Sequence, residues 1–256
     1  MFREEIEEVS KSAYKKVSLL KTNTLGYFFS AILAGIYVSL GVVFAFSVGG
    51  MLHDFSGYKL IVGICFGMAL SLVAFAGAEL FTGNNFVMTV GVNKKTISWL
   101  DGIKLWVMCY LGNLVGSLII VLLFFLGGFL KDGYIPEFFI KTANSKINLQ
   151  PLEIITRAIM CNILVCLATW TGYRCKSESG KLIMIFWCIL SFVTSSFEHS
   201  IANMSLLTIG LISPNSDITI NGILYNISLA TIGNIIGGAI FVAVPYLIIS
   251  RKTKNN

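Results

Sequence analysis

The sequence predicts an all-α integral membrane protein with six transmembrane helices, in which the second and fifth helices are broken and the two halves form an inverted repeat. Of the 256 residues, 55% are hydrophobic and only 12% are charged, against about 25% charged in an ordinary soluble domain. The mean hydropathy is +0.80, and a globular protein of this size could not bury so much apolar surface. The net charge of +6 does not indicate nucleic-acid binding, because the basic residues are spread over the ends of the apolar runs.

Six apolar runs are long enough to cross a bilayer core, which takes roughly 20 residues. They cover residues 27–50, 60 to about 90, 103–130, 152–173, 182–212 and 223–250. We therefore expect a six-span transmembrane domain over residues 27–250, with repeat halves of about 27–130 and 151–250. A cytoplasmic amphipathic N-terminal segment, 1–26, precedes this domain, and a cytoplasmic tail, 251–256, follows it.

The distribution of lysine and arginine predicts the orientation of these spans. Fourteen basic residues fall on the side that holds both termini, and four fall on the opposite side, at Lys59, Lys131, Lys141 and Lys146. Arg157 lies inside a span. Because loops rich in lysine and arginine remain in the cytoplasm, we expect both termini there, in a multi-pass protein of the inner (cytoplasmic) membrane.

The second and fifth apolar runs are overlong, and polar and small residues interrupt both midway. The interruptions read AGAELFTGNN at 76–85 and FEHSIANM at 197–204. Non-helical backbone at membrane depth is tolerated only where protein buries it or where it lines a water-filled cavity. We therefore expect the interruptions to meet near the midplane, where freed backbone N–H groups and helix N-termini favour an anion or a polar neutral solute.

Paired motifs in the two halves predict the repeat. Glu79 and Glu198 are separated by 119 positions, and each is followed five residues later by an asparagine. The third span carries GNLVG at 112–116 and the sixth carries GNIIG at 233–237, separated by 121 positions. Since each half has three spans, an odd number, the two copies must enter the membrane in opposite senses.

Three stretches carry a resemblance to a known family. AELFTGNN at 78–85, CNILVCLATW at 161–170 and FEHSIANM at 197–204 resemble the signature stretches of the formate/nitrite transporter family, with most similarity to its nitrite and hydrosulfide channel branches. The resemblance covers about residues 25–249. It implies an aquaporin-like protomer with a pore through each subunit, assembled as a homopentamer in the lipid bilayer, that passes small monovalent anions and needs no cofactor.

The resemblance assigns four residues to the pore and its selectivity. His199 matches the family's single pore histidine, and a lone imidazole can hydrogen-bond to an anion or lend it a proton; a packed histidine is the alternative. Thr82 is expected to face this ring, although it could instead cap a half-helix that begins near Asn84. Asn162 is expected near the pore. Lys146 is expected at the outer vestibule, with a solvated loop lysine as the alternative.

The resemblance also implies a narrow pore with bulky apolar side chains on either side of the histidine. The residues at these positions are Phe66, Leu70, Leu80 and Phe192. Such a constriction strips water from the permeating solute and disfavours bare ions. Packing between helices is the alternative role for these side chains.

Two acids and two asparagines are expected to have a structural role at the broken helices. A path lined by the carboxylates of Glu79 and Glu198 would repel an anion, so we expect both to accept hydrogen bonds from freed backbone N–H groups. Asn84 and Asn203 are expected to join the same network, and so are Asn113, Asn162 and Asn234.

These patterns favour a passive channel for small monovalent anions or their weak acids. Hydrosulfide is favoured over nitrite and formate, because a tight, apolar, histidine-centred pore suits a small anion whose conjugate acid is neutral. An aquaporin-type channel for neutral solutes is the alternative, but none of the four prolines lies in an interruption, so paired Asn-Pro-Ala loops are missing. An enzyme is not expected, because one buried histidine supplies neither a nucleophile with its base nor a metal cluster.

Overall fold

The computed structural model describes residues 1–251, and all regular structure in that range is helical, which confirms the all-α prediction. Of the predicted tail, residues 252–256 lie outside the described residues. In chain order the elements are α1 (Arg3–Thr22), α2 (Thr24–Met51), α3 (Tyr58–Phe75), α4 (Phe81–Asn93), α5 (Trp99–Leu126), α6 (Tyr134–Ile147), α7 (Pro151–Arg174), α8 (Glu178–Thr194), α9 (Ser200–Ile212), α10 (Ile220–Ile236), the π-helix η1 (Gly237–Ala243) and α11 (Val244–Ile249).

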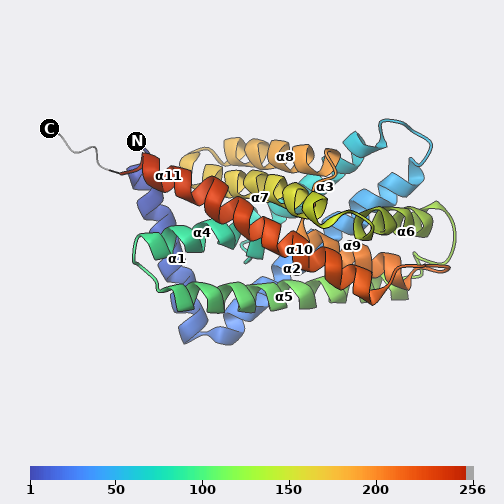
Figure 1. Cartoon of the computed structure of the whole chain (residues 1–256), viewed down its shortest axis with the longest axis horizontal. Helices are drawn as coiled ribbons and strands as arrows, with labels where there is room; N and C mark the ends of the chain where they lie inside the picture. Colours follow the sequence, from blue (N-terminus) through green and yellow to red (C-terminus); the bar gives the residue numbers. More distant parts are fainter. Residues whose placement is uncertain (252–256) are drawn as a thin grey trace.

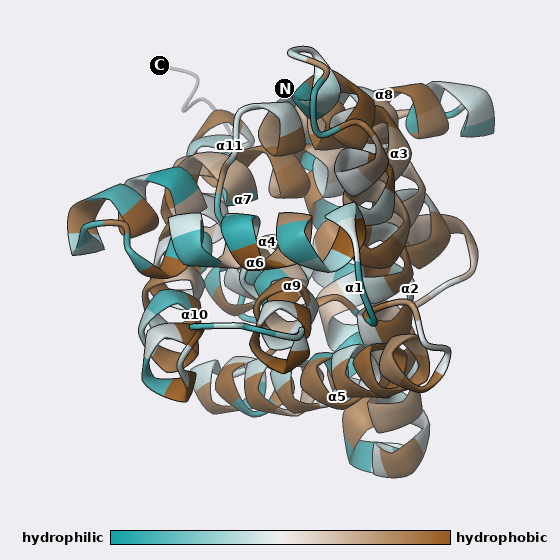
Figure 2. Cartoon of the chain, turned by 90° about the vertical axis from the view of Figure 1, so that its right-hand side faces the viewer, coloured by the Kyte–Doolittle hydropathy of each residue, from teal (hydrophilic) through white to brown (hydrophobic). Residues whose placement is uncertain are grey.

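Long apolar helices make up most of the molecule (Figure 1). Among the described residues, five helical stretches are long and apolar enough to cross a membrane, namely α2, α3, α5, α7 and the continuous run from α10 to α11. Figure 2 shows these helices mostly in brown, the hydrophobic colour. On α5, Leu122, Leu123 and Leu126 remain more than half exposed. Apolar surface of this extent suits lipid or a partner subunit rather than water.

Only the first part of each predicted interruption is non-helical, residues 76–80 and 197–199, and the remainder begins the next helix. α3 ends at Phe75 and α4 begins at Phe81, and likewise α8 ends at Thr194 and α9 begins at Ser200. Each connection turns through one residue with positive φ, Gly77 (76°) in the first and Ser196 (57°) in the second. These two residues are 119 positions apart, the same separation as the paired glutamates.

The two halves use equivalent helix contacts. A Cβ on Gly112 of α5 would lie 2.5 Å from the Cβ of Ala31 on α2, and a Cβ on Gly233 of α10 would lie 2.6 Å from the Cβ of Ala158 on α7. Glycine at both positions therefore allows the helices to approach closely. In Figure 1, α5 runs away from the end that holds both termini, whereas α10 to α11 runs toward it. The equivalent helices are thus antiparallel.

A short helix that the sequence analysis did not predict, α6, lies between the two halves. It occupies residues 134–147, which we expected to be a loop, because polar residues interrupt its apolar pattern. Phe138, Phe139 and Ala143 nevertheless form a buried face on one side of it. Figure 1 shows α6 at one end of the molecule and α1 across the opposite end, beside both termini.

The N-terminal helix α1 is packed against the rest of the chain. Its buried side chains Ile6, Val9, Ala13 and Val17 recur at helical spacing. Its charged side chains form ion pairs with four other elements, namely Glu5–Arg174, Glu7–Lys94, Lys16–Glu79 and Lys21–Asp101. The hydrogen bond from Lys94 lowers the pKa of Glu7 below its ordinary value. This helix is therefore part of the folded domain, rather than a separate tail.

We expect Gly233→Ala to lower the melting temperature of the protein in detergent. The added Cβ would lie 2.6 Å from both the Ala158 Cβ and the Ile155 carbonyl oxygen, and overpacking of this kind costs about 1–3 kcal/mol. Gly172→Ala is the control, because nothing lies within 4 Å of a Cβ at that position. Equal melting temperatures for the two variants would contradict the tight contact between α7 and α10.

Candidate functional site

His199 and Thr82 meet at the centre of the molecule, and both side chains are buried. His199 occupies the N-cap position of α9, where its Nδ1 accepts a hydrogen bond from the Ala202 backbone N–H at 3.0 Å. Its Nε2 lies 3.1 Å from Thr82 Oγ1. Because Nδ1 is an acceptor, the neutral ring carries its proton on Nε2 and donates it to the threonine hydroxyl. The ring therefore presents a hydrogen-bond donor toward Thr82.

Leu80 is the equivalent of His199 in the first half. It occupies the N-cap position of α4 with φ −103° and ψ 126°, close to the −108° and 110° of His199. Its side chain cannot cap the helix, and α4 begins at Phe81. The alternative role for Thr82, as a cap for a half-helix beginning near Asn84, was therefore wrong, because Thr82 lies inside the first turn of α4.

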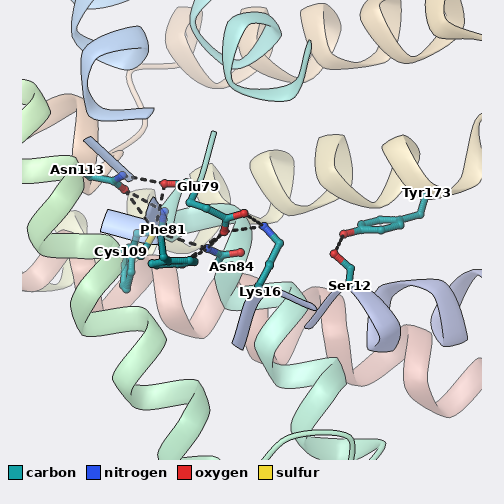
Figure 3. Close-up of polar contacts among 9 residues, drawn as sticks. Ser12, Lys16, Glu79, Phe81, Asn84, Cys109, Asn113 and Tyr173 are labelled. Carbon is teal, nitrogen blue, oxygen red and sulfur yellow. Dashed lines mark hydrogen bonds and ion pairs between the residues drawn. The ribbon is translucent and has the colours of Figure 1, made fainter. Parts of the chain in front are cut away.

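Glu79 binds side chains rather than backbone (Figure 3). The Lys16 ammonium group, which α1 supplies, donates to its Oε1 at 2.6 Å. The Asn84 amide donates to its Oε2 at 2.9 Å, and the Tyr27 hydroxyl lies 3.4 Å from the same oxygen. A partly buried carboxylate needs such partners, because leaving a charge unpaired next to an apolar interior is costly.

Glu198 has the equivalent environment in the second half. Its Oε1 accepts from the Lys146 ammonium group of α6 at 2.7 Å, and its Oε2 accepts from the Asn203 amide at 2.6 Å and the Asn226 amide at 3.2 Å. We expected Glu79 and Glu198 to accept backbone N–H groups, and this was wrong. Each carboxylate instead pairs with a lysine from a helix that is not one of the five long apolar stretches: Lys16 from α1 and Lys146 from α6.

Asn113 and Asn234 bind the freed backbone groups that we had assigned to the acids. Asn113 Oδ1 accepts from the Phe81 N–H at 3.0 Å, while its Nδ2 donates to the carbonyls of Ala31 at 2.7 Å and Glu79 at 2.9 Å. The amide group thus bonds one donor and one acceptor at the first break and connects them to a carbonyl inside α2. In apolar surroundings the Phe81 N–H would otherwise remain unpaired, at a cost of several kcal/mol.

Asn234 makes the same three bonds at the second break. Its Oδ1 accepts from the Ser200 N–H at 2.9 Å, and its Nδ2 donates to the carbonyls of Ala158 at 2.8 Å and Glu198 at 3.0 Å. These asparagines are the second residues of the GNLVG and GNIIG motifs. The sequence analysis placed both in the network at the breaks, and the structure shows that they bind backbone groups there.

Asn162 is buried behind Thr82 rather than exposed to a hollow. Its Nδ2 donates to the Thr82 carbonyl at 3.2 Å and to the Asn234 carbonyl at 2.5 Å. The Cys166 thiol lies 3.4 Å from the same Thr82 carbonyl. Asn162 therefore holds the backbone of Thr82 in place and connects it to the second break.

Two hollows approach the His199–Thr82 pair from opposite sides. The first, which we call the Lys146 vestibule, has a volume of about 270 Å³ and is lined in part by Phe66, Phe192, Lys146, Glu198 and His199. The second, the Lys16 vestibule, has a volume of about 710 Å³ and is lined in part by Leu70, Leu80, Lys16, Glu79 and Asn84. The four predicted constriction residues thus divide into two pairs, one facing each vestibule. Thr82 lines neither and is fully buried between them.

Lys16 is the site residue that sequence reasoning missed. It precedes Glu79 by 63 positions, whereas Lys146 precedes Glu198 by 52. Because these separations differ, the constant offset between the two halves does not relate Lys16 to Lys146. Only the docking of α1 onto the first break shows that Lys16 is the counterpart of Lys146 (Figure 3).

The long apolar helices enclose two hollows, and both hollows approach the buried His199–Thr82 pair. These features define a multi-pass membrane transport protein. The chain belongs to the formate/nitrite transporter family, whose sequence profile matches residues 3–248. This confirms the resemblance carried by the three signature stretches.

Several relatives and solved structures support this assignment. The nitrite transporter NirC of Salmonella typhimurium is 35% identical over 99% of this chain and 94% of its own length. The formate channel FocA of Escherichia coli is 34% identical over 90% of this chain and 88% of its own. A structure described as an FNT family ion channel superposes with a TM-score of 0.93 at 35% identity, covering 97% of this chain and 99% of the other. A pentameric formate channel with formate bound gives 0.78 at 30%, covering 93% and 98%.

We expect Asn234→Ala and Asn113→Ala each to destabilise the protein by several kcal/mol. Each variant leaves the N–H of Phe81 or Ser200 without its partner and removes the bond to the carbonyl of the glutamate at that break, and an unsatisfied buried group costs about 1–3 kcal/mol. Asn148→Ala is the control, because that exposed side chain bonds only to the Asn144 carbonyl. Thermal unfolding in detergent measures the effect. Variants as stable as the control would show that the two asparagines are not needed to hold the breaks.

Proposed function

We propose that the protein is a passive channel for small monovalent anions or their weak acids, with His199 and Thr82 as its selective centre. The single observation that carries this proposal is the buried His199–Thr82 hydrogen bond between two vestibules. The similarity to a nitrite transporter and a formate channel supports nitrite and formate as the anions to test. Hydrosulfide, which the sequence analysis favoured, becomes a third candidate after them.

The helix pairs α3–α4 and α8–α9 are proposed as one interrupted crossing each. Together with α2, α5, α7 and the run α10–α11 they give six crossings. The equivalence of the two connections, with positive φ at Gly77 and Ser196, supports this count. Both termini lie at one end of the molecule (Figure 1), as an even number of crossings requires. The excess of basic residues at that end supports a cytoplasmic location for it, with the spans in the inner membrane.

Permeation is proposed to proceed by exchange of hydrogen-bond partners at the centre. Phe66 and Phe192 on one side, and Leu70 and Leu80 on the other, strip water from the solute. The anion then replaces the Thr82 hydroxyl as the acceptor for the His199 Nε2–H. Since Nδ1 is occupied by the Ala202 N–H, adding a second proton to the ring would break the N-cap of α9. The ring therefore works as a neutral donor rather than as a source of protons.

A homopentamer is the proposed assembly, supported by the similarity to a pentameric formate channel. The exposed apolar side chains of α5, α3 and α8 leave ample surface for neighbouring copies and lipid. Each protomer contains its own pair of vestibules, so five pores would work in parallel. The aquaporin-type alternative is not favoured, because the relatives named above are an anion transporter and an anion channel.

Purified protein in liposomes is expected to carry nitrite and formate down their gradients. Once the anion has replaced it as the acceptor, the Thr82 hydroxyl is free to donate to the anion. Thr82→Val removes this donor at nearly constant shape and should slow flux about tenfold, the factor expected for one lost hydrogen bond of about 1.4 kcal/mol. Thr208→Val is the matched control on α9, where the hydroxyl bonds only to the Met204 carbonyl. If wild type passes neither nitrite, formate nor hydrosulfide, the proposed function is wrong.

A comparison of His199→Asn with His199→Ala tests the role of the ring. Asparagine keeps an N–H donor and an oxygen that can cap α9, whereas alanine removes both. We expect His199→Asn to retain the pH dependence of wild-type flux, and His199→Ala to lose most of its stability or flux. A pH dependence that disappears in His199→Asn would mean that the ring exchanges protons with the solute.

A further inference from the structure

The two vestibules occupy equivalent places in the repeat but carry different charges. Lys59 lines the Lys146 vestibule, and Glu178, 119 positions later, lines the Lys16 vestibule. Arg157 and Ser30 are a second equivalent pair, because their carbonyls accept the Glu198 and Glu79 backbone N–H at 3.5 and 3.2 Å. Each of these also lines its own vestibule. At these two equivalent positions, therefore, the Lys146 vestibule has two cations, whereas the Lys16 vestibule has an acid and a neutral serine.

The basic residues of one end of the molecule gather around one hollow. Five basic residues do not belong to the side that holds the termini. Four of these five line the Lys146 vestibule, namely Lys59, Lys141, Lys146 and Arg157. The acid in that lining, Glu198, is already paired with Lys146. Within residues 1–251, the other three cations form no ion pair. The Lys16 vestibule instead contains Lys181 and Glu178, whose charges cancel.

Of these three cations, Arg157 is the one whose backbone contacts the second break. It belongs to the second turn of α7, and its backbone bonds to Glu198, the residue before His199. Its side chain is partly buried, and within the described chain its guanidinium donates no hydrogen bond. A guanidinium is planar and always charged, and its paired N–H groups match two coplanar oxygens. Nitrite and formate both present such oxygens.

We propose that Arg157, Lys59 and Lys141 form an anion-capture site in the Lys146 vestibule that has no counterpart in the Lys16 vestibule. This inference rests on the proposed anion channel and adds a difference between its two faces. A hollow with apolar walls and charges of one sign focuses the electric field and raises the local anion concentration. The channel remains passive, so the gradient still sets the direction of net flux. The apparent KM, however, is lower for anions that enter through the Lys146 vestibule.

The test measures nitrite flux in liposomes, with the orientation of the protein scored by protease cleavage of a terminal tag. In wild type, KM is expected to be lower when nitrite is supplied to the Lys146 side, and 1 M salt should reduce the difference. Arg157→Ser and Lys59→Glu place the residues of the other vestibule here, and each should raise KM from this side about tenfold and so reduce the difference between the two sides. Arg157→Lys keeps the charge and should restore most of the low KM.

The reciprocal variant makes the test independent of any folding defect at Arg157. Ser30→Arg combined with Glu178→Lys transfers the cations to the Lys16 vestibule, and KM from that side should fall. Equal KM values from both sides in wild type, with no response to Arg157→Ser or to salt, would overturn the inference. Absence of all anion flux in wild type would instead defeat the proposed function itself.

Discussion

The structure depends on how two helix breaks in an apolar interior satisfy their backbone polar groups. Without water, every N–H and C=O freed at a break needs a partner from the protein. Asn113 and Asn234 each accept one N–H and donate to one carbonyl at a break, and each also donates to a carbonyl inside a neighbouring long helix. Because each asparagine also connects its break to α2 or α7, the positions of Leu80 and His199 at the ends of the breaks follow directly from this binding.

Charge compensation explains why α1 and α6, which are not among the long apolar helices, are nevertheless needed near the centre of the structure. Glu79 and Glu198 are held close to the breaks, and each needs a cation that the long apolar helices do not supply. α1 provides Lys16 and α6 provides Lys146, from opposite ends of the molecule (Figure 1). A buried pair of this kind is costly to open by removal of one partner. The two helices are consequently coupled to the centre, although neither contributes a residue to the His199–Thr82 contact.

The sequence was sufficient for the helical class, the two interruptions and the family, because Glu-x4-Asn and the GN motifs recur at nearly constant separation. It also singled out His199 and Thr82, although their facing came from the resemblance. Hydrogen-bond partners were harder to predict: the acids bind lysines and amides, and asparagines bind the backbone. That division depends on which side chains reach the breaks in three dimensions. α6 was not predicted because its polar face hides the periodicity of Phe138, Phe139 and Ala143. The role of Lys16 was not predicted because it depends on α1 packing against the first break, which no sequence pattern indicates.

The equivalence of Leu80 and His199 has an evolutionary consequence. A pore assembled from two identical copies of one half would carry the same side chain at both N-cap positions, either two imidazoles or two aliphatic groups. Joining the halves covalently into a single polypeptide removes that symmetry and lets each position diverge alone. A single imidazole at the centre, opposite an aliphatic side chain, therefore requires two halves that differ in sequence.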